Sequence, residues 1–459
     1  MRRSALILGV TLLTTLACST KQKPRTGIEA DTTRSEADWL KLEPVRLLHD
    51  YIRIDTRVRN GEEEGALFWK RFFDCDGIEN EIVCPAPRRC NVLARLPGKR
   101  REGALLLLNH IDVAEVYERL WEFPPFEGRI KLGYLNGRGT YDMKSLALAQ
   151  ALALRELKRH GVVPNEDILF LAEADEESGQ HWGSAWLFAH RPEWFRGVTE
   201  VLNEGGVDEM ILRDVRYWGI ETVQAGYASG EFESSAEGPL SELAKRWVRL
   251  PGEPVAPHPH VVIGFDMLAN HLVMPLTDLL RHLDRVRRNP AELAQLPDRY
   301  GSFLEPRIHW FRPYAYPPDA KGNFRSDVLI SVPPGEDPGP FLASILRDAS
   351  AAGIRVLESA SSGVSPASPY PTRFTELLKR ATEVHYPGIP FGPMPTFAGF
   401  TTSILFRQKG FPTYGYSPIP MNIFDAVRRH GNDERVYLRD YLNGVALYED
   451  IVVDYATGP

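Results

Sequence analysis

Acidic residues and histidines occur in five short motifs along this chain. The motifs lie at residues 109–112 (N-H-I-D), 137–144 (G-R-G-T-Y-D-M-K), 175–179 (D-E-E-S-G), 203–206 (N-E-G-G) and 430–434 (H-G-N-D-E). Each motif alone has an ordinary explanation as a turn or a solvated loop. Together they place carboxylates at the ends of apolar segments, where an unpaired buried charge is costly. Imidazole and carboxylate groups without a thiolate suit zinc, cobalt or manganese, so the motifs predict a metal cluster.

An α/β sheet is expected to position these motifs. Four consecutive leucines within residues 104–109 are typical of a strand that is buried on both faces. Further strands are predicted at 91–96 and 167–172, and helices at 39–54, 143–160 and 438–452. Because such sheets bind ligands beyond the carboxyl ends of their strands, we expect the histidine and acidic side chains to meet there.

The length of the chain and the change in its residue pattern indicate two domains. At 459 residues the chain is longer than those that ordinarily form a single hydrophobic core. After residue 222 the pattern changes to polar strands, proline-rich loops and a helix near 267–287, and the earlier pattern returns after residue 365. We therefore expect an α+β unit at 223–364, inserted between two catalytic segments at 37–222 and 365–459.

Composition and charge limit the function classes. The chain is 43% apolar and 25% charged, which is ordinary for a soluble globular protein. Its formal net charge of −7, with no clustered basic surface, argues against nucleic acid as a partner.

The first 18 residues resemble an export signal. Arg2 and Arg3 precede an apolar stretch at residues 5–17, which is too short to span a bilayer as a helix. The T-L-A-C string that ends at Cys18 is similar to a bacterial lipobox, and ordinary secretion with cleavage near Ala17 is the alternative. The polar residues 19–36 predict a tether. We expect an exported periplasmic or cell-envelope lipoprotein whose membrane contact is this anchor.

Three further cysteines remain. Cys75, Cys84 and Cys90 allow one disulfide and one free thiol in an exported protein. They form no C-x-x-C motif and have no histidine near them in the sequence, so a loop disulfide is favoured over a metal site. The pairing stays open.

The order of the five motifs resembles the di-zinc peptidase and aminoacylase family that includes carboxypeptidase G, aminoacylases, carnosinases and succinyl-diaminopimelate desuccinylase. The strings W-E-F-P-P-F-E-G at 121–128 and G-F-P-T-Y-G-Y-S-P at 410–418 add to the resemblance, which covers both catalytic segments. It implies a zinc-exopeptidase-like catalytic domain with a mixed sheet and an inserted lid and dimerisation domain. It also implies hydrolysis of a peptide or an N-acylated amino acid, and leaves open which of the two.

Carried over position by position, the resemblance implies roles for seven residues. Five would bind two divalent ions, Zn²⁺ with Co²⁺ or Mn²⁺ as alternatives: His110, Asp142, Glu177, Glu204 and His430. Asp142 would bridge the ions, with His110 and Glu204 on one and Glu177 and His430 on the other. Glu176 would be the general base that takes a proton from the activated water. Asp112 would orient His110 through a hydrogen bond.

The inserted unit departs from the family pattern. A Gly-x-x-Gly-His string is expected soon after its first strand, but residues 237–241 are E-G-P-L-S. His258 or His260 is a candidate for the missing oxyanion contact, with a surface histidine pair as the alternative. The inserted unit is also where relatives dimerise, so a homodimer is a candidate partner state and the oligomeric state stays open.

The contact to a substrate carboxylate also differs. Residues 329–335 (L-I-S-V-P-P-G) lack the arginine that relatives use there, and Thr402 stands where many relatives have aspartate. Three other arginines are candidates for this contact: Arg307, Arg312 and Arg325. We therefore expect an atypical substrate, or a carboxylate bound by other residues.

Two other classes of protein compete with a hydrolase. A binding lipoprotein that kept the metal site would explain the missing lid histidine, but it has no need of Glu176. A one-metal or structural zinc protein predicts about one ion per chain, and six candidate residues around one bridging aspartate argue against it. We therefore predict a metal-dependent amidohydrolase.

Overall fold

The computed structural model describes residues 31, 33–100, 102–179, 181–206, 209–211, 214–311, 318, 321–396, 400–422 and 424–458. The predicted export signal at 1–18, most of the predicted tether, and Arg312 lie outside these residues. Within the described ranges, no helix has both the length and the apolar character needed to cross a membrane.

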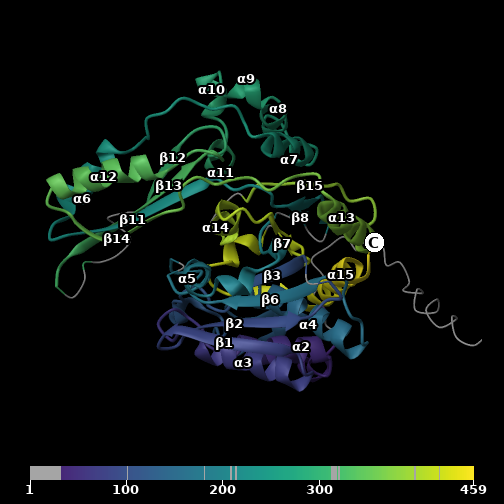
Figure 1. The fold of residues 1–459 in the computed structure, drawn as a ribbon. Helices are drawn as coiled ribbons and strands as arrows, with labels where there is room; N and C mark the ends of the chain where they lie inside the picture. The colour runs from purple at the N-terminus through teal and green to yellow at the C-terminus, as the bar shows by residue number, and fades with distance from the viewer. Residues whose placement is uncertain are drawn as a thin grey trace, which may run out of the picture.

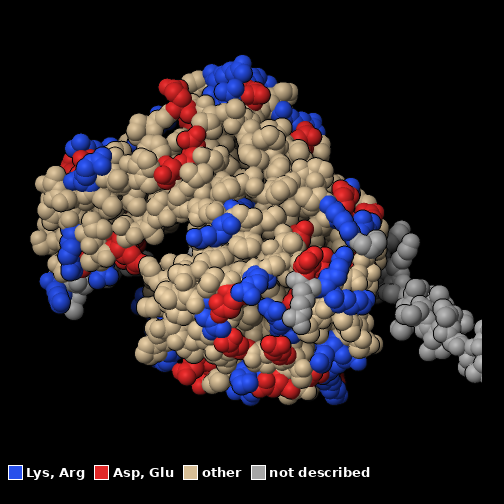
Figure 2. Space-filling model, viewed as in Figure 1, with Lys and Arg blue, Asp and Glu red and all other residues tan. Residues whose placement is uncertain are grey.

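The chain forms a lower part built on a six-stranded sheet and an upper part built on a four-stranded sheet (Figure 1). The surface is hollowed between the two parts (Figure 2). In the lower sheet the order is β1 (Glu79–Ala86), β2 (Arg89–Leu96), β6 (Asp167–Glu173), β3 (Ala104–His110), β7 (Val198–Asn203) and β16 (Thr413–Gly415). The last four strands run parallel, and β2 is antiparallel to both of its neighbours. The mixed sheet implied by the family resemblance is therefore confirmed.

Helices cover both faces of the lower sheet. One face packs against α2 (Glu43–Ile52), α3 (Glu63–Cys75), α4 (Lys144–Arg159), α13 (Arg373–His385) and α15 (Leu438–Thr457). The other packs against α5 (Ser184–His190), η2 (Pro192–Phe195) and α14 (Ser403–Gln408). In β3, Leu105 and Leu107 belong to the first core and Leu106 and Leu108 to the second. The four-leucine run is thus buried on both faces, as predicted, and each buried leucine contributes about 1.5–3 kcal/mol.

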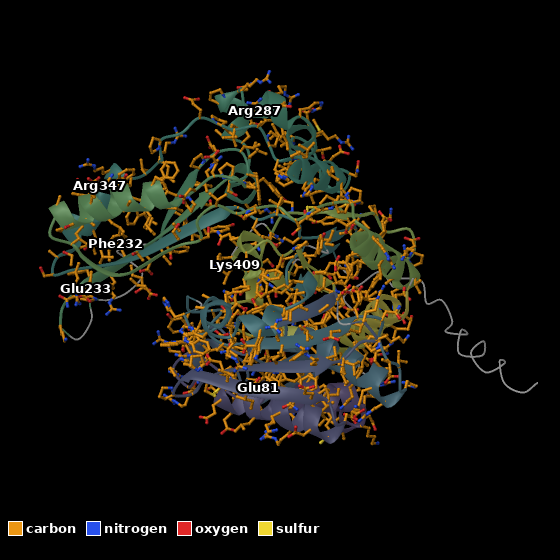
Figure 3. The ribbon with its side chains drawn as sticks, in the orientation of Figure 1. Glu81, Phe232, Glu233, Arg287, Arg347 and Lys409 are labelled. Atoms are coloured by element: carbon orange, nitrogen blue, oxygen red, sulfur yellow. A yellow bond between two sulfur atoms is a disulfide. The ribbon has the colours of Figure 1, made fainter. Side chains whose placement is uncertain are left out.

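The upper part lies between residues 226 and 361, inside the segment expected to be inserted. Its sheet has the order β12 (Arg307–Phe311), β13 (Phe324–Val332), β11 (Gly226–Ser234) and β14 (Arg355–Ser361), and it packs against α6 (Glu237–Arg246) and α12 (Gly339–Ala351). Short helices form a second core beside it: α7 (Pro259–Ala269), α8 (Leu276–Arg281), α9 (Leu283–Val286), α10 (Pro290–Leu293) and α11 (Asp298–Gly301). Figure 3 shows Phe232 and Arg347 in this part and Glu81 in the lower part.

Three small sheets and three short helices complete the described chain. Their members are β10 (Trp218–Ile220) with β15 (Phe391–Pro393); β17 (Met421–Asn422), β8 (Glu209–Ile211) and β9 (Asp214–Val215); β18 (Arg435–Tyr437), β5 (Tyr134–Asn136) and β4 (Arg129–Lys131); and α1 (Glu36–Leu40), η1 (Glu118–Leu120) and η3 (Ala426–Arg428). Antiparallel pairing of Arg435 with Asn136 brings the motifs at 137–144 and 430–434 side by side.

Two predicted helices are wrong in extent because prolines interrupt them. The helix expected at 39–54 is divided into α1 and α2, and Pro44 lies in the first turn of α2. The helix expected at 267–287 is divided among the end of α7, α8 and α9, and Pro275 precedes α8. Proline lacks an N–H group and its ring clashes with the preceding turn, so it favours the first turn of a new helix.

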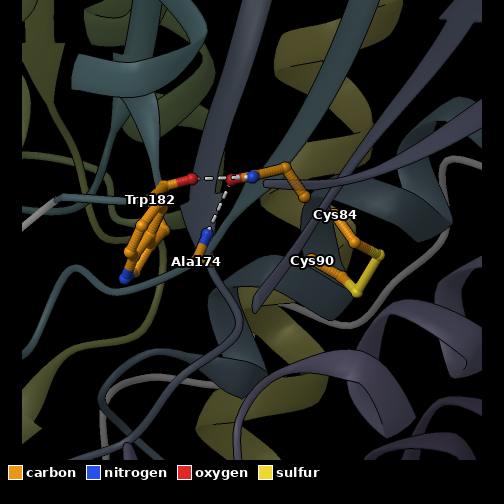
Figure 4. The surroundings of a disulfide bond; sticks show 5 residues. Cys84, Cys90, Ala174 and Trp182 are labelled. Carbon is orange, nitrogen blue, oxygen red and sulfur yellow. Dashed lines mark hydrogen bonds between the residues drawn. A yellow bond between two sulfur atoms is a disulfide. The ribbon is translucent and has the colours of Figure 1, made fainter. Parts of the chain in front are cut away.

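The cysteine pairing left open by the sequence is settled in the β1–β2 hairpin. Cys84 and Cys90 form a disulfide across the hairpin, and Cys75 is an exposed free thiol (Figure 4). Asn91 donates a hydrogen bond to the Trp182 carbonyl at 2.8 Å and accepts one from the Ala174 N–H at 2.9 Å. The hairpin is thereby tied to the chain that follows β6.

Candidate metal centre

The five predicted ligands converge beyond the carboxyl ends of β6, β3 and β7, which are neighbours in the sheet. His110 is the last residue of β3, and the loops after β6 and β7 carry Glu177 and Glu204. Asp142 lies two residues before α4, and His430 lies in the loop between η3 and β18. Segments that are far apart in sequence thus supply one cluster, at the position where α/β sheets bind ligands.

Asp142 lies between the two histidines of the cluster. Its Oδ1 is 3.2 Å from His110 Nε2, and its Oδ2 is 3.0 Å from His430 Nε2. Glu177 Oε2 is 3.2 Å from His430 Nε2, and Glu204 Oε1 is 3.7 Å from His110 Nε2. The geometry is therefore two-sided around Asp142, with one histidine and one glutamate on each side.

A buried ion pair ties together the two loops that carry Asp142 and His430. The Glu434 carboxylate accepts hydrogen bonds from three N–H groups of residues 139–142, at 2.7–3.0 Å, and from Arg138 Nη1 at 2.7 Å. Arg138 Nη2 also donates to the Gly431 carbonyl at 2.8 Å. Both side chains are almost fully buried. Charge-assisted hydrogen bonds of this kind are among the strongest in proteins, so the pair fixes the distance between the loops.

Asp112 connects β3 to the loop after β6. Its carboxylate accepts hydrogen bonds from the Glu176 N–H at 3.1 Å and the Glu177 N–H at 2.9 Å. Its main-chain carbonyl lies 2.8 Å from His110 Nδ1, whereas its carboxylate lies 3.5 Å from the same atom. The expected orientation of His110 by Asp112 thus comes mainly from the main chain. This contact places the proton on Nδ1 and directs Nε2 to the cluster.

Buried negative charge makes the cluster fit a cation. Burial raises the pKa of Glu176 well above its usual value and that of Glu204 to about 8. Hydrogen bonds that His430 donates to Asp142 and then to Glu177 raise the pKa of His430 to about 11. Among the described residues, no hydrogen-bond partner exists for the buried atoms Glu176 Oε1 and Glu177 Oε1. Divalent cations would neutralise the negative charge of these carboxylates and be coordinated by their unpartnered oxygens. The residues present therefore fit a metal centre.

A cavity of about 460 Å³, here called the central pocket, lies between the cluster and the upper sheet. Its floor contains Asp142, Glu176, Glu177, Glu204, Arg429 and His430. Its roof comes from the upper sheet and contains Tyr227, Ala228, Ser229, Leu329, Ala360 and Ser361. Its side wall includes Phe400, Thr401, Ile404, Leu405 and Gln408. A charged floor thus faces a roof without charged residues.

The family described as Peptidase family M20/M25/M40 matches residues 106–454, which is more than half of the chain. The chain belongs to this family. The matched region contains every residue of the cluster, together with Arg138 and Glu434. The metallopeptidase and aminoacylase family named from the motifs is therefore confirmed.

Curated members of the M20 family match different shares of the chain. A probable succinyl-diaminopimelate desuccinylase from Staphylococcus aureus (strain Mu50) is 34% identical over 139 residues, which are 30% of this chain and 34% of the relative. This chain thus covers about a third of the length of that relative. Aminoacylase-1 of Mus musculus is 25% identical over 430 residues, which are 90% of this chain and 96% of the relative.

Solved structures share the M20 fold over nearly the whole chain. Human carnosine dipeptidase 1 has a TM-score of 0.69 at 15% identity and covers 90% of this chain and 97% of its own. An M20 family metallo-carboxypeptidase from Sulfolobus solfataricus has the same TM-score and identity, covering 90% of this chain and 99% of its own. These likenesses establish the fold.

Two histidines expected near the substrate lie elsewhere in this M20 chain. His258 caps the start of α7, accepting a hydrogen bond from the His260 N–H at 3.2 Å. His260 Nδ1 lies 3.0 Å from Thr222 Oγ1, and its ring packs on Tyr370. Neither histidine lines the central pocket. Local capping and packing occupy both rings in the single chain, and the expected substrate contact stays a prediction.

Two of the three predicted carboxylate-binding arginines, Arg307 and Arg325, are described, and neither lines the central pocket. Arg307 pairs with Glu305 at 2.7 Å and Arg325 lies 3.4 Å from Glu233, and their contact to a substrate carboxylate stays a prediction. Arg429 was not predicted from the sequence, and it is the one arginine or lysine among the described residues that line the pocket. Its position directly before His430 was the available signal.

Proposed function

We propose that this chain is a metal-dependent hydrolase that cleaves a peptide or N-acyl amide bond with two divalent ions, zinc foremost. Its membership of the M20 family supports hydrolysis. The observation that carries the proposal is the two-sided cluster around Asp142, with the unpartnered carboxylate of Glu176 beside it on the floor of the central pocket. In this proposal His110, Asp142 and Glu204 bind one ion, and Asp142, Glu177 and His430 bind the second.

The neighbouring residues Glu176 and Glu177 have different roles in the proposed reaction. When bound, the ions would polarise the amide carbonyl and make the attacking water more acidic. Glu176 takes the proton from that water and delivers it to the nitrogen of the leaving amine. Asp112 holds the N–H groups of both glutamates, so Glu176 can face the substrate while Glu177 faces His430.

Arg429 supplies the positive charge that the missing lid histidine does not. Its Nε lies 3.9 Å from Asp142 Oδ2, on the pocket floor. Burial lowers its pKa, but Asp142 and Glu204 outweigh this effect and keep the guanidinium charged. We assign Arg429 to stabilising the negative charge that develops on the carbonyl oxygen.

The proposal also includes a location and a partner state. The lipobox-like string ending at Cys18 supports export to the periplasm or cell envelope and an N-terminal lipid anchor. A homodimer formed through the upper part is part of the same proposal. A second candidate function is a binding lipoprotein that kept the metal site. It is favoured by one observation, that no histidine from the upper part is among the described residues lining the central pocket.

Hydrolysis by the full-length zinc-loaded chain separates the two functions. We would assay dipeptides and N-acyl amino acids with wild type, Glu176→Gln, and Glu358→Gln as an exposed control on β14. The proposal predicts that Glu176→Gln lowers turnover about 10²–10⁴-fold and keeps its metal, while the control matches wild type. Ligand binding that persists in both wild type and Glu176→Gln, without turnover in either, would establish the binding protein instead.

A further inference from the structure

A second cavity, here called the arginine pocket, lies on the other side of Glu177 and His430. Its volume is about 690 Å³, and its lining includes Arg59, Arg88, Arg89, Glu115, Glu177 and His430. The last two residues also line the central pocket. The proposed second metal site therefore opens onto two cavities of different character.

The β1–β2 hairpin fixes Arg88 at the rim of this pocket. Pro87 and Arg88 form the turn between Ala86 and Arg89, which pair across the hairpin, and the Cys84–Cys90 disulfide closes the strands next to it. Arg88 has a φ of 64°, and its carbonyl accepts a hydrogen bond from the Glu62 N–H at 2.8 Å.

Close packing beneath the turn holds it in place. A Cβ atom on Gly61 would lie 2.5 Å from the Arg88 carbonyl oxygen, so only glycine lets the chain pass there. Gly61 itself has a φ of 80°, a conformation that glycine adopts without strain. The backbone that carries Arg88 is thus held by a disulfide, a hydrogen bond and a tight contact.

The three arginines differ in how their charge is balanced. Arg89 donates to the buried Glu62 at 2.8 Å. Arg59 lies 3.9 Å from Glu115 and 3.7 Å from Glu118, in the exposed setting where ion pairs are weak. No ion pair or hydrogen bond is made by the Arg88 side chain with any residue that the structure describes. The arginine pocket therefore holds an unbalanced positive charge next to the metal centre.

We propose that the arginine pocket binds an anionic group of the substrate, a carboxylate, through Arg88 with help from Arg59. This inference rests on the proposed hydrolysis. An amide bond held at the cluster extends to both sides of it, and the uncharged roof of the central pocket suits an apolar group. The favoured substrate is thus asymmetric, with an apolar group on one side of the scissile amide and a carboxylate on the other.

Two pairs of substrates test the proposal and tell which side carries the carboxylate. The first pair is an N-acylated amino acid and its C-terminal carboxamide, which removes the charge from the amine side. The second is an N-succinyl amide of an apolar amine and the matching N-butanoyl amide, which removes it from the acyl side. We would measure kcat and KM for the full-length zinc-loaded chain, for Arg88→Gln and Arg88→Lys, and for Arg347→Gln as an exposed control on α12. Thermal melting of each variant checks its folding.

The proposal predicts that, for one of the pairs, wild type has a KM about tenfold lower for the charged member, as a charge-assisted hydrogen bond would give. Arg88→Gln removes most of this preference with little change in kcat, Arg88→Lys restores part of it, and Arg347→Gln keeps all of it. Hydrolysis with the same preference in wild type and Arg88→Gln would overturn this inference alone, as would a wild type with no preference in either pair. No turnover of any member by wild type would overturn the proposed function as well.

Discussion

The floor of the central pocket is lined by charged residues, whereas its roof is lined by uncharged ones. On the floor, the loops that carry the acidic and basic side chains are held by hydrogen bonds of their main chains to Arg138, Glu434 and Asp112. The roof consists of uncharged residues such as Tyr227, Ala228 and Leu329, which lie on the strands of the upper sheet. In the proposed function, the floor determines the reaction and the roof determines which amide substrate is accepted.

The largest effect is expected on the floor, from Asp142→Asn. Asp142 contacts both histidines, so the loss of its charge is expected to weaken the binding of both proposed ions. Because bound metal contributes several kcal/mol to the transition state, turnover should fall by about a thousandfold or more. Metal analysis and kinetics on the same samples would check this. An Asp337→Asn control in the upper part should retain both metals, and an active, fully loaded Asp142→Asn protein would contradict the assignment.

A smaller effect is expected from the ion pair that supports the floor. Arg138→Met should lower metal affinity about 10–100-fold, the usual cost of removing support behind a ligand. Arg407→Met is a matched control, because Arg407 is equally buried and pairs with the buried Glu221. Glu221 also accepts hydrogen bonds from Gln224 and Thr396, at the junction with the upper part.

Metal titration and thermal melting together separate the two ion pairs. Breaking either pair should cost about 3–5 kcal/mol of stability. Only the Arg138 variant should bind metal more weakly, and Glu434→Gln gives a second version of the same test. Equal loss of metal affinity in the Arg138 and Arg407 variants would show that general destabilisation explains both.

The roof should affect substrate choice and leave the reaction unchanged. Leu329→Ala removes apolar surface from the roof, so the KM for substrates with a large apolar group should rise about tenfold. Metal content and the KM for small substrates should stay as in wild type. Leu346→Ala, on α12, is the control for loss of a leucine outside the pocket. An equal change for large and small substrates would contradict a selective roof.

The smallest effect concerns the pH dependence of stability behind the floor. Burial, followed by the charge of Asp112, raises the pKa of Glu62 to about 7. The folded state thus binds this proton more tightly than the unfolded state does. The stability from this group is present below pH 4.5 and is lost as the pH rises through about 7, by at most about 3 kcal/mol.

Melting of the metal-free chain between pH 5 and pH 8 tests this sign. As the pH rises over this range, Glu62→Gln should lose less stability than wild type. The melting temperature of the variant should therefore fall by a few degrees less than that of wild type. Glu336→Gln, exposed in the upper part, should follow wild type. Parallel pH profiles for wild type and Glu62→Gln would contradict the shifted pKa.

The sequence predicted features that depend on a local pattern of residues. It did not predict contacts that depend on how distant segments pack together. The leucines of β3, the residues that cluster around Asp142, and the family were accessible because strand burial and motif order are local patterns. Arg138 and Glu434 were inside the quoted motifs, but their pairing across the fold became visible only when β18 and β5 were seen to pair. The capping role of His258 was not predicted, because residue type alone does not distinguish a helix cap from a pocket lining.

Metal content measured alongside turnover tests the central claim most directly. We would remove metal from the full-length chain with a chelator, titrate zinc back, and follow bound zinc per chain and hydrolysis together. The account predicts about two zinc ions per chain at saturation, with activity that is lost on chelation and restored as the sites fill. Saturation at one ion would contradict the two-sided centre, and a chain that binds no metal, or hydrolyses amides equally well without it, would contradict the account as a whole.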